Sequence, residues 1–398
     1  RYPIIPCHTV AQFLQPDRFM MPSSTGNPIQ RLRGLALIVF LLGLFLFAPL
    51  TQPIPSQAQS ANATSRLFLP VIYRDYQPTP LYATSYYIQD ETPARMYDLG
   101  CTLGSRDRSL PGAQDSLVVL NFGQGWFDGG NLNKPGAGLF SPYWHYVPIS
   151  AIEAAVKAYI QGYWVCSAED QESQIMVAIG TNNYGGYGSN TTDQNTRRTY
   201  AYEHGKVWAQ MVVRLIQWVW SSGYSRQVSV AGATDIEWDS QLTGWNTPYV
   251  TYGWVNGFDN YDNGQAIFYN FGACVGCPTS ANPNWVYSST NPWTQFDVYY
   301  VSYGAPPAWP LPEIYATSGV NARQWQAISR YGAIYLGRPM EFAGVMTQYQ
   351  ACQQRGGCSG INNTPEAGWK QLFDALNADP LTRQPILRWI TDIRWQIK

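Results

Sequence analysis

The amino-acid sequence predicts an α/β protein, a (β/α)8 TIM-like barrel preceded by a signal or anchor segment. Eight short apolar runs follow one another along the chain, and helical patterns lie between several of them. The runs are continuously apolar rather than alternating, which indicates strands buried on both faces, as in a parallel sheet. Eight such strands with intervening helices favour a barrel, and an open doubly wound sheet is the main alternative.

The expected elements follow from apolar runs and from helical spacing of apolar residues. The expected strands lie at 84–89, 116–123, 174–183, 228–237, 265–272, 296–304, 312–319 and 342–349. The expected helices lie at 149–163, 206–220 and, in shorter form, around Trp325 and Trp369. No glycine-rich phosphate motif follows a strand, so a nucleotide-binding version of either fold has no support.

The composition favours a partner that is polar but uncharged. Only 13% of the 398 residues are charged, 15% are aromatic, and the net charge is −1. Disordered chains carry more charge and fewer aromatic residues, and nucleic-acid-binding proteins usually show a basic surplus. We therefore expect no nucleic-acid partner. Sugars stack on aromatic rings and bond to amides and hydroxyls, so a polysaccharide or glycan is the expected partner.

The N-terminal region reads as a targeting segment. Arg31 and Arg33 precede an unbroken apolar run at 34–50, and small residues follow it. This pattern is typical of a secretory signal, and a membrane anchor is the alternative if the run is not cleaved. The first Met is Met20, so residues 1–19 can be translated upstream sequence. The stretch at 66–74 resembles the opening of bacterial exported proteins.

The expected organisation follows from these features. Residues 1–60 hold the upstream stretch and the signal or anchor, 61–80 form a linker, and 81–398 form the barrel domain. The predicted localisation is secreted or cell-surface.

Cysteine usage agrees with export. Beyond the apolar run the chain has an even set of six cysteines, which suggests disulfides in an oxidising compartment: Cys101, Cys166, Cys274, Cys277, Cys352 and Cys358. Cys352 with Cys358 and Cys274 with Cys277 would close short loops, leaving one long bridge. A redox or zinc role for CVGC at 274–277 is the alternative, although His145 and His204 are the only histidines of the mature chain. We expect no metal and no cofactor.

The fourth expected strand ends in acids, in the stretch VSVAGATDIEWD at 228–239. Side chains alternate faces along a strand, so Asp235 and Glu237 point the same way, with Ala231 and Ala233 before them. The small residues leave room inside a barrel, and the acids reach its mouth at the carboxyl end of the strand. Catalysis in barrel enzymes takes place at that end.

Paired carboxylates on one face supply the parts for glycoside hydrolysis. One must be protonated to give its proton to the leaving oxygen, and the other must be ionised. Two acids placed close together have pKa values that are pushed apart, which produces one of each. We expect Glu237, the outer residue, to be the general acid and Asp235 to support it.

A partial resemblance to known families accompanies these residues. Asp235-x-Glu237 at the end of a fourth barrel strand resembles the glycoside hydrolases of families 18 and 25. The family 18 motif D-x-x-D-x-D-x-E is present in its last two acids, with Ala233 and Val230 at the earlier positions. The run at 298–304, with Tyr303, resembles the aromatic sixth strand of family 18, whose Tyr helps to hold the substrate. The resemblance implies a barrel hydrolase with Tyr303 at its substrate.

Other side chains near strand ends are candidates for binding sugar. Asn121, Asn182 and Gln348 could hold hydroxyls through their amides, and Trp126 and Tyr303 could stack on rings. Each of the amides could equally cap a loop, and most tryptophans in such a chain are structural. Glu313 opens an expected strand, so we expect it at the opposite rim.

The predicted function is a secreted glycoside hydrolase-like protein that cleaves a polysaccharide by carboxylate acid/base catalysis. A barrel that binds carbohydrate without cleaving it, or a cell-surface structural protein whose acids only solvate a rim, are the alternatives. A serine hydrolase is excluded because no G-x-S-x-G elbow is present.

Overall fold

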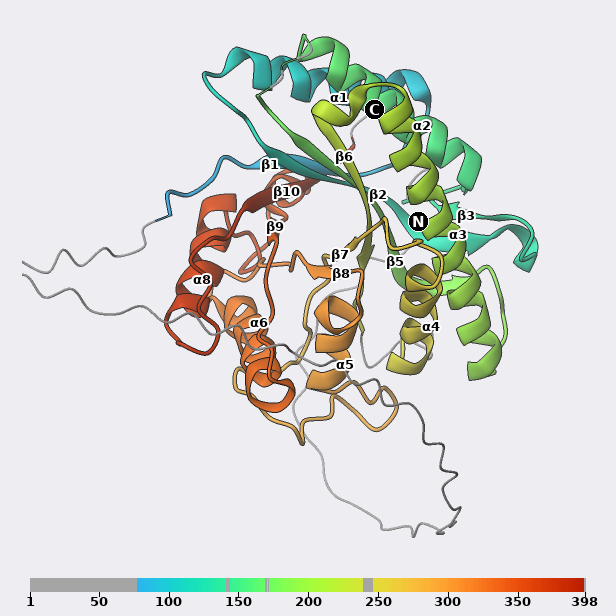
Figure 1. The fold of residues 1–398 in the computed structure, drawn as a ribbon. Coiled ribbons are helices and arrows are strands. Elements are labelled where there is room, and N and C mark those ends of the chain that lie inside the picture. Colours follow the sequence, from blue (N-terminus) through green and yellow to red (C-terminus); the bar gives the residue numbers. More distant parts are fainter. Residues whose placement is uncertain (1–76, 141–143, 169, 171, 239–245, 397–398) are drawn as a thin grey trace, which may run out of the picture. The chain divides into compact units, whose positions relative to one another are not determined.

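Eight parallel strands form a nearly closed ring in the computed structural model of the chain, with helices around it (Figure 1). The structure describes residues 77–140, 144–168, 170, 172–238 and 246–396, all of them within the unit Val71–Lys398. The predicted signal or anchor and most of the predicted linker lie outside the described residues. The ring is the expected (β/α)8 arrangement rather than an open sheet.

The strands of the ring follow one another in chain order around the barrel. They are β1 (Ala83–Tyr87), β2 (Ser116–Phe127), β5 (Ile175–Tyr187), β6 (Val228–Asp235), β7 (Phe268–Asn270), β8 (Ala308–Pro310), β9 (Gly344–Thr347) and β10 (Trp389–Trp395). β10 pairs with both β1 and β9. The last gap, between β8 and β9, is bridged by backbone hydrogen bonds of 2.9 Å, from Ala343 N to Pro310 O, Met346 N to Pro312 O and Ile314 N to Met346 O.

Helices connect the strands and cover the outside of the ring. They are α1 (Pro93–Ser109), α2 (Ile149–Cys166), α3 (Gln194–Ser221), α4 (Pro248–Asp259), α5 (Gln295–Tyr299), α6 (Val320–Tyr331), α7 (Tyr349–Gln354) and α8 (Pro365–Asn377). Among the residues that the structure describes, no helix has both the length and the apolar character needed to cross a membrane.

Along each strand, alternate side chains point into the ring and outward toward the helices. The inward-facing set is small where β6 passes, with Ala231 and Ala233, and larger elsewhere. The interior cluster consists of Leu117, Val119, Ala178, Ala231, Ala233, Tyr269, Phe271, Leu311, Met346 and Ile393. A larger apolar cluster lies between the strands and the helices. The alternation predicted for 228–237 is therefore observed.

Three expected elements are corrected. Residues 296–304, expected as a strand, are helical: α5 continues into a π-helical turn over Tyr300–Gly304. Thr294 and Asp297 form a capping box that begins this helix, with Asp297 N donating to Thr294 Oγ1 and Thr294 N donating to the Asp297 carboxylate. Aromatic and β-branched residues mimic a strand in composition, but the cap satisfies the first backbone groups of a helix.

The sixth barrel strand lies between the expected strands 296–304 and 312–319. The strand expected at 312–319 is absent, and the sixth strand of the ring is β8, centred on Trp309 just before it. Glu313 pairs with Met346 of β9, so it lies at the carboxyl end of β8 rather than at the opposite rim. The eighth strand, β10, was not expected because Asp392 and Arg394 interrupt its apolar run. Asp392 is buried and accepts hydrogen bonds from Thr347 Oγ1 at 2.6 Å and Tyr349 N at 2.8 Å, which accounts for an acid buried between the ring and α7.

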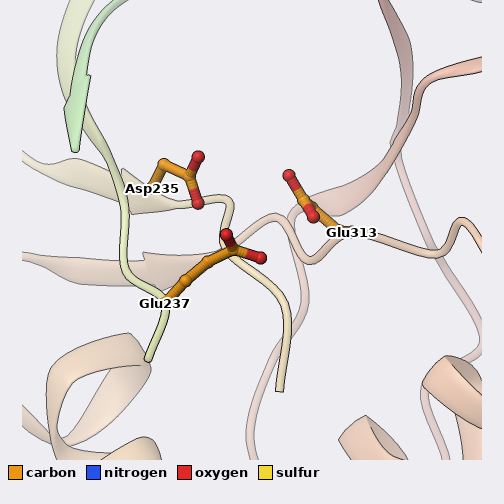
Figure 2. Close-up of side chains that lie close together, drawn as sticks. All are labelled: Asp235, Glu237 and Glu313. Carbon is orange, nitrogen blue, oxygen red and sulfur yellow. The ribbon is translucent and has the colours of Figure 1, made fainter. Parts of the chain in front are cut away.

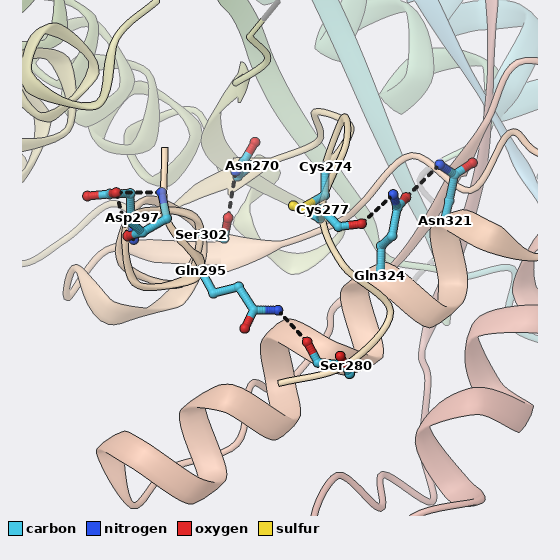
Figure 3. The surroundings of a disulfide bond; sticks show 10 residues. Asn270, Cys274, Cys277, Ser280, Gln295, Asp297, Ser302, Asn321 and Gln324 are labelled. Carbon is cyan, nitrogen blue, oxygen red and sulfur yellow. Dashed lines mark hydrogen bonds between the residues drawn. A yellow bond between two sulfur atoms is a disulfide. The ribbon is translucent and has the colours of Figure 1, made fainter. Parts of the chain in front are cut away.

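Three disulfides join the six cysteines in the pairs that the spacing favoured. Cys101 and Cys166 link α1 to α2, and the other bridges are Cys274–Cys277 and Cys352–Cys358. The CVGC segment therefore holds a disulfide that tightens the loop after β7. Gln324 of α6 donates to Cys277 O at 2.9 Å and so fixes this loop against the helix (Figure 3).

Two of the strands run past the rim of the ring. β2 and β5 have 12 and 13 residues, and β2 also pairs with the antiparallel strand β3 (Pro135–Gly138), which pairs with β4 (Tyr146–Pro148). His204 of α3 anchors this extension. Its Nε2 donates to Gly136 O at 2.9 Å, and its Nδ1 accepts from Trp254 Nε1 at 3.0 Å. Burial lowers the pKa of His204 to about 4.

We predict that His204 makes the fold acid-sensitive. In the unfolded chain a histidine takes up its proton near pH ~6.5, whereas His204 in the folded protein stays neutral down to about pH 4. Protonation therefore favours unfolding between these pH values, and the free energy of unfolding falls by about 3 kcal/mol across them. Urea unfolding at several pH values measures this slope.

Matched variants isolate the contribution of this side chain. His204→Gln should lose that part of the slope, whereas His145→Gln, which changes an exposed histidine, should keep it. The same slope in the His204→Gln variant as in the wild type would contradict the assignment.

Candidate active site

Three carboxyl groups meet at the mouth of the ring, at the carboxyl ends of β6 and β8. One oxygen each of Asp235, Glu237 and Glu313 lies within 4.8 Å of the others. Figure 2 shows the three side chains directed toward one another, two from the β6 segment and Glu313 from the segment that follows β8. The pair that alternation predicted is therefore joined by a third acid.

Burial differs among the three groups. Glu313 is only 5% exposed, whereas Asp235 and Glu237 are partly exposed. The Oδ1 atom of Asp235 is nonetheless buried and has no hydrogen-bond partner among the described residues. A buried carboxyl oxygen without a partner is costly, which indicates an atom that is kept for a proton or a ligand.

Crowding raises the affinity of Asp235 and Glu313 for protons. Burial, and then the charge of Glu237, raise the pKa of Asp235 well above its ordinary range. Burial, and then the charges of Glu237 and Asp235, do the same to the pKa of Glu313. Two like charges at such short range cannot both be ionised cheaply, so the cluster retains at least one proton at a pH where isolated acids have none.

Two tyrosines complete the surroundings of Glu313. The hydroxyl of Tyr315 donates to Glu313 Oε1 at 2.6 Å. It also forms a hydrogen bond with the hydroxyl of Tyr87 at the end of β1. Burial, and next the charge of Glu313, raise the pKa of both tyrosines well above their ordinary value. Both hydroxyls therefore stay protonated and can only act as neutral hydrogen-bond donors or acceptors.

The backbone of Glu237 is held beyond the end of the strand by one side chain. Asn183 of β5 accepts from Glu237 N at 3.1 Å and donates to Glu237 O at 2.9 Å. Asn270 of β7 accepts from Ile236 N and is itself fixed by Ser302. These amides replace the strand pairing that has ended, so Glu237 keeps the inward direction that alternation assigns to it.

The other predicted binding residues fall into two groups. Asn182, which pairs with Asp235 at the end of the β5–β6 ladder, and Trp126, in the extension of β2, face inward and are partly exposed. Asn121 faces inward but is fully buried. Gln348 donates to Ile361 O at 3.2 Å and so holds a loop. Tyr303 lies in the helical turn that precedes β8, against Arg338 and Trp309, and not at the mouth.

The sequence did not predict the roles of two residues at the mouth, Glu313 and Asn183. Glu313 was expected at the start of a strand over 312–319, which the structure does not have, and Asn183 was passed over in favour of its inward-facing neighbour Asn182. Trp238 points away from the acids, as alternation along the strand requires. It is 2% exposed and stacks on Trp293 with ring centroids 4.4 Å apart.

Three clustered carboxylates could also bind a hard cation, since calcium and magnesium prefer oxygen ligands.

Comparisons with known proteins add little to this geometry. No protein-family model matches the chain, and no curated protein matches its sequence. Among solved structures, a GH5-4 broad specificity endoglucanase from an uncultured bacterium is similar over 77% of each chain, with a TM-score of 0.36 and 9% identity. A likeness at this level assigns neither a family nor an activity, and the resemblance to families 18 and 25 stays a prediction.

We predict that Glu313 destabilises the folded protein at neutral pH. A carboxyl whose folded pKa is raised binds its proton more tightly when folded, so stability falls as pH rises above ~4.3, its unfolded value. Glu313→Gln removes the charge and can still accept from Tyr315. Its unfolding temperature should exceed that of the wild type, and the difference should widen from pH 4.5 toward neutrality in thermal unfolding.

The matched control for this measurement is Glu341→Gln. Glu341 is exposed and precedes β9, at the other end of the ring. The Glu341→Gln substitution should leave the unfolding temperature unchanged. A Glu313→Gln variant no more stable than the wild type at any pH would show that the three acids do not crowd one another.

Proposed function

We propose that this protein hydrolyses glycosidic bonds of a polysaccharide by carboxylate acid/base catalysis. The observation that carries the proposal is the convergence of three acids from two strands at the mouth of a barrel, one with a buried, unpartnered oxygen. Structural acids at a rim are solvated or paired with cations. These acids face one another instead, which is costly unless the retained proton has a use.

The proposed reaction begins with proton transfer from Glu237. The bond between the anomeric carbon and the leaving oxygen breaks, and Glu237 gives that oxygen the proton that the three acids share. Asp235 and Glu313 lie deeper, and whichever of them is then ionised forms a covalent bond to the anomeric carbon as the leaving oxygen departs. Water then adds its hydroxyl to the anomeric carbon, displaces that carboxylate and gives a proton to Glu237, so the cluster regains its starting protonation.

Mutation of Glu237 tests the acid role. Glu237→Gln should lower the release of reducing ends from cellulose, chitin or xylan by about a hundred- to ten-thousand-fold, the usual contribution of general acid–base catalysis. Dinitrophenyl glycosides, whose leaving group needs no proton, should release dinitrophenol in the first turnover nearly as fast with the variant as with the wild type. A merely structural role would depress both substrates equally.

Two controls accompany this experiment. Glu341→Gln should leave both activities unchanged. A chelator should also leave them unchanged, whereas loss of activity with a chelator and its recovery with calcium or magnesium would assign the three acids to a cation instead. Wild-type protein that releases no reducing ends from any of the three polysaccharides between pH 4 and pH 8 would contradict the proposal.

We also predict that hydrolysis retains the anomeric configuration. Inverting enzymes hold their two carboxyl groups ~6.5–9.5 Å apart to admit a water molecule, and retaining enzymes hold them ~5–5.5 Å apart. One oxygen of each of the three acids lies within 4.8 Å of the others, and this close spacing favours the retaining arrangement. Proton NMR of the first products, recorded before mutarotation, should show the substrate's own anomer, and the opposite anomer would refute the assignment.

A further inference from the structure

A row of inward-facing positions runs sideways from the catalytic acids into the sheet extension. Asp235 pairs with Asn182 of β5, Asn182 pairs with Gln124 of β2, and Gln124 pairs with Gly138 of β3. Residues directly opposite each other on neighbouring strands project to the same face of a sheet. All four positions therefore face the side on which Asp235 meets the other acids.

The orientation of this row is fixed independently by its neighbours. A Cβ on Gly125 would lie 2.6 Å from the ring of Tyr187 and 2.9 Å from His204, so Gly125 faces the helices. Gln124 and Trp126, on either side of it, therefore face the mouth. Both are partly exposed, and no hydrogen bond of the Gln124 amide to a described residue is present.

At the end of the row, the indole of Trp144 fills the space that a side chain at Gly138 would occupy. A Cβ on Gly138 would lie 2.7 Å from Trp144 Nε1 and 3.3 Å from Gln124 Cγ, so the indole of Trp144 occupies the space above Gly138. Trp144 is 49% exposed. Its ring contacts Trp126 edge-on, with centroids 5.3 Å apart and planes at 81°. One tryptophan thus supports another whose surface remains open to solvent.

We propose that Trp144 is a stacking platform for a sugar ring of a neutral polysaccharide, remote from the bond that is cleaved. The inference rests on the proposed function. Three strand spacings of about 4.8 Å separate Gly138 from Asp235, which amounts to roughly 14 Å and more than one sugar ring. The chain would cross from the acids over Asn182 and Gln124, whose amides can bond hydroxyls, to the exposed indole.

The chemistry of the row favours a neutral ligand. Between the acids and Trp144 the side chains are two amides, and the row contains no cation that would hold a uronic acid or sulfate group. An aromatic ring is apolar on its faces, and the axial C–H face of a sugar is apolar too, so stacking removes both from water.

Binding measurements in an inactive background test this platform separately from catalysis. The parent is Glu237→Gln, and the probes are cellohexaose and chitohexaose followed by tryptophan fluorescence and calorimetry. One or both should bind the parent. Adding Trp144→Ala should weaken binding by about tenfold or more, as loss of an aromatic anchor usually does. Trp144→Phe should retain part of the affinity, and the disaccharides of both series should bind all variants equally.

Matched variants separate stacking from damage to the fold. Trp220→Ala removes another exposed tryptophan, 70% exposed at the far end of α3, and should leave affinity unchanged. Gly138→Ala puts a methyl group against the indole and should weaken hexasaccharide binding without removing any aromatic ring.

Several outcomes would overturn the platform. They are equal affinity of Trp144→Ala and its parent, an equal loss in Trp220→Ala, no binding of either hexasaccharide to the parent, or tighter binding of polygalacturonate than of both neutral chains. Failure of hydrolysis in the wild type would refute the proposed catalysis but would leave these affinities measurable, so the two failures are distinguishable.

Discussion

Repulsion among three crowded carboxyl groups is the interaction around which this structure is organised. Asp235, Glu237 and Glu313 have oxygens within 4.8 Å, and Glu313 is nearly inaccessible to solvent. An unfolded chain would separate them, so the folded protein must hold them together by other contacts. The retained proton is the physical consequence, and it is also what an acid catalyst requires at neutral pH.

The supporting contacts come from neutral groups rather than from cations. Asn183 fixes both backbone groups of Glu237, and Tyr315 donates to Glu313. A lysine or arginine in their place would neutralise the cluster and release its proton. Neutral amides and hydroxyls give position without changing charge, so the acids remain crowded and their pKa values remain high.

The sequence was informative where burial and alternation act together. The run before Asp235 is apolar on one parity and small on the other, and this predicted both the strand and the inward direction of its acids. Tertiary contacts decided the other cases. The stretch 296–304 has strand-like composition but a helix cap at Thr294, and β10 contains Asp392, whose partners lie on β9 and α7. Local sequence does not reveal such partners.

The expected position of Glu313 was wrong because the bounds of its strand were wrong. Expected at the start of a strand, it was assigned to the rim away from Asp235 and Glu237. Its strand is short and rich in proline, with Pro310 and Pro312 limiting the hydrogen bonds that mark an ordinary strand. The residue follows β8, and its pairing with Met346 helps to close the ring. The contact that closes the barrel therefore also brings the third carboxyl group to the mouth.

The extension of β2 and β5 makes the mouth of the ring asymmetric. Most strands of the ring end near the acids, but these two continue and carry β3 beside them, anchored by His204 and Trp254 on the helix side. Anchoring one face of the extension leaves the opposite face, with Gln124 and Trp126, open toward the mouth. A rigid surface of this kind loses little freedom when a polymer binds. The same buried imidazole that makes the fold acid-sensitive therefore also holds the surface on which a long substrate would lie.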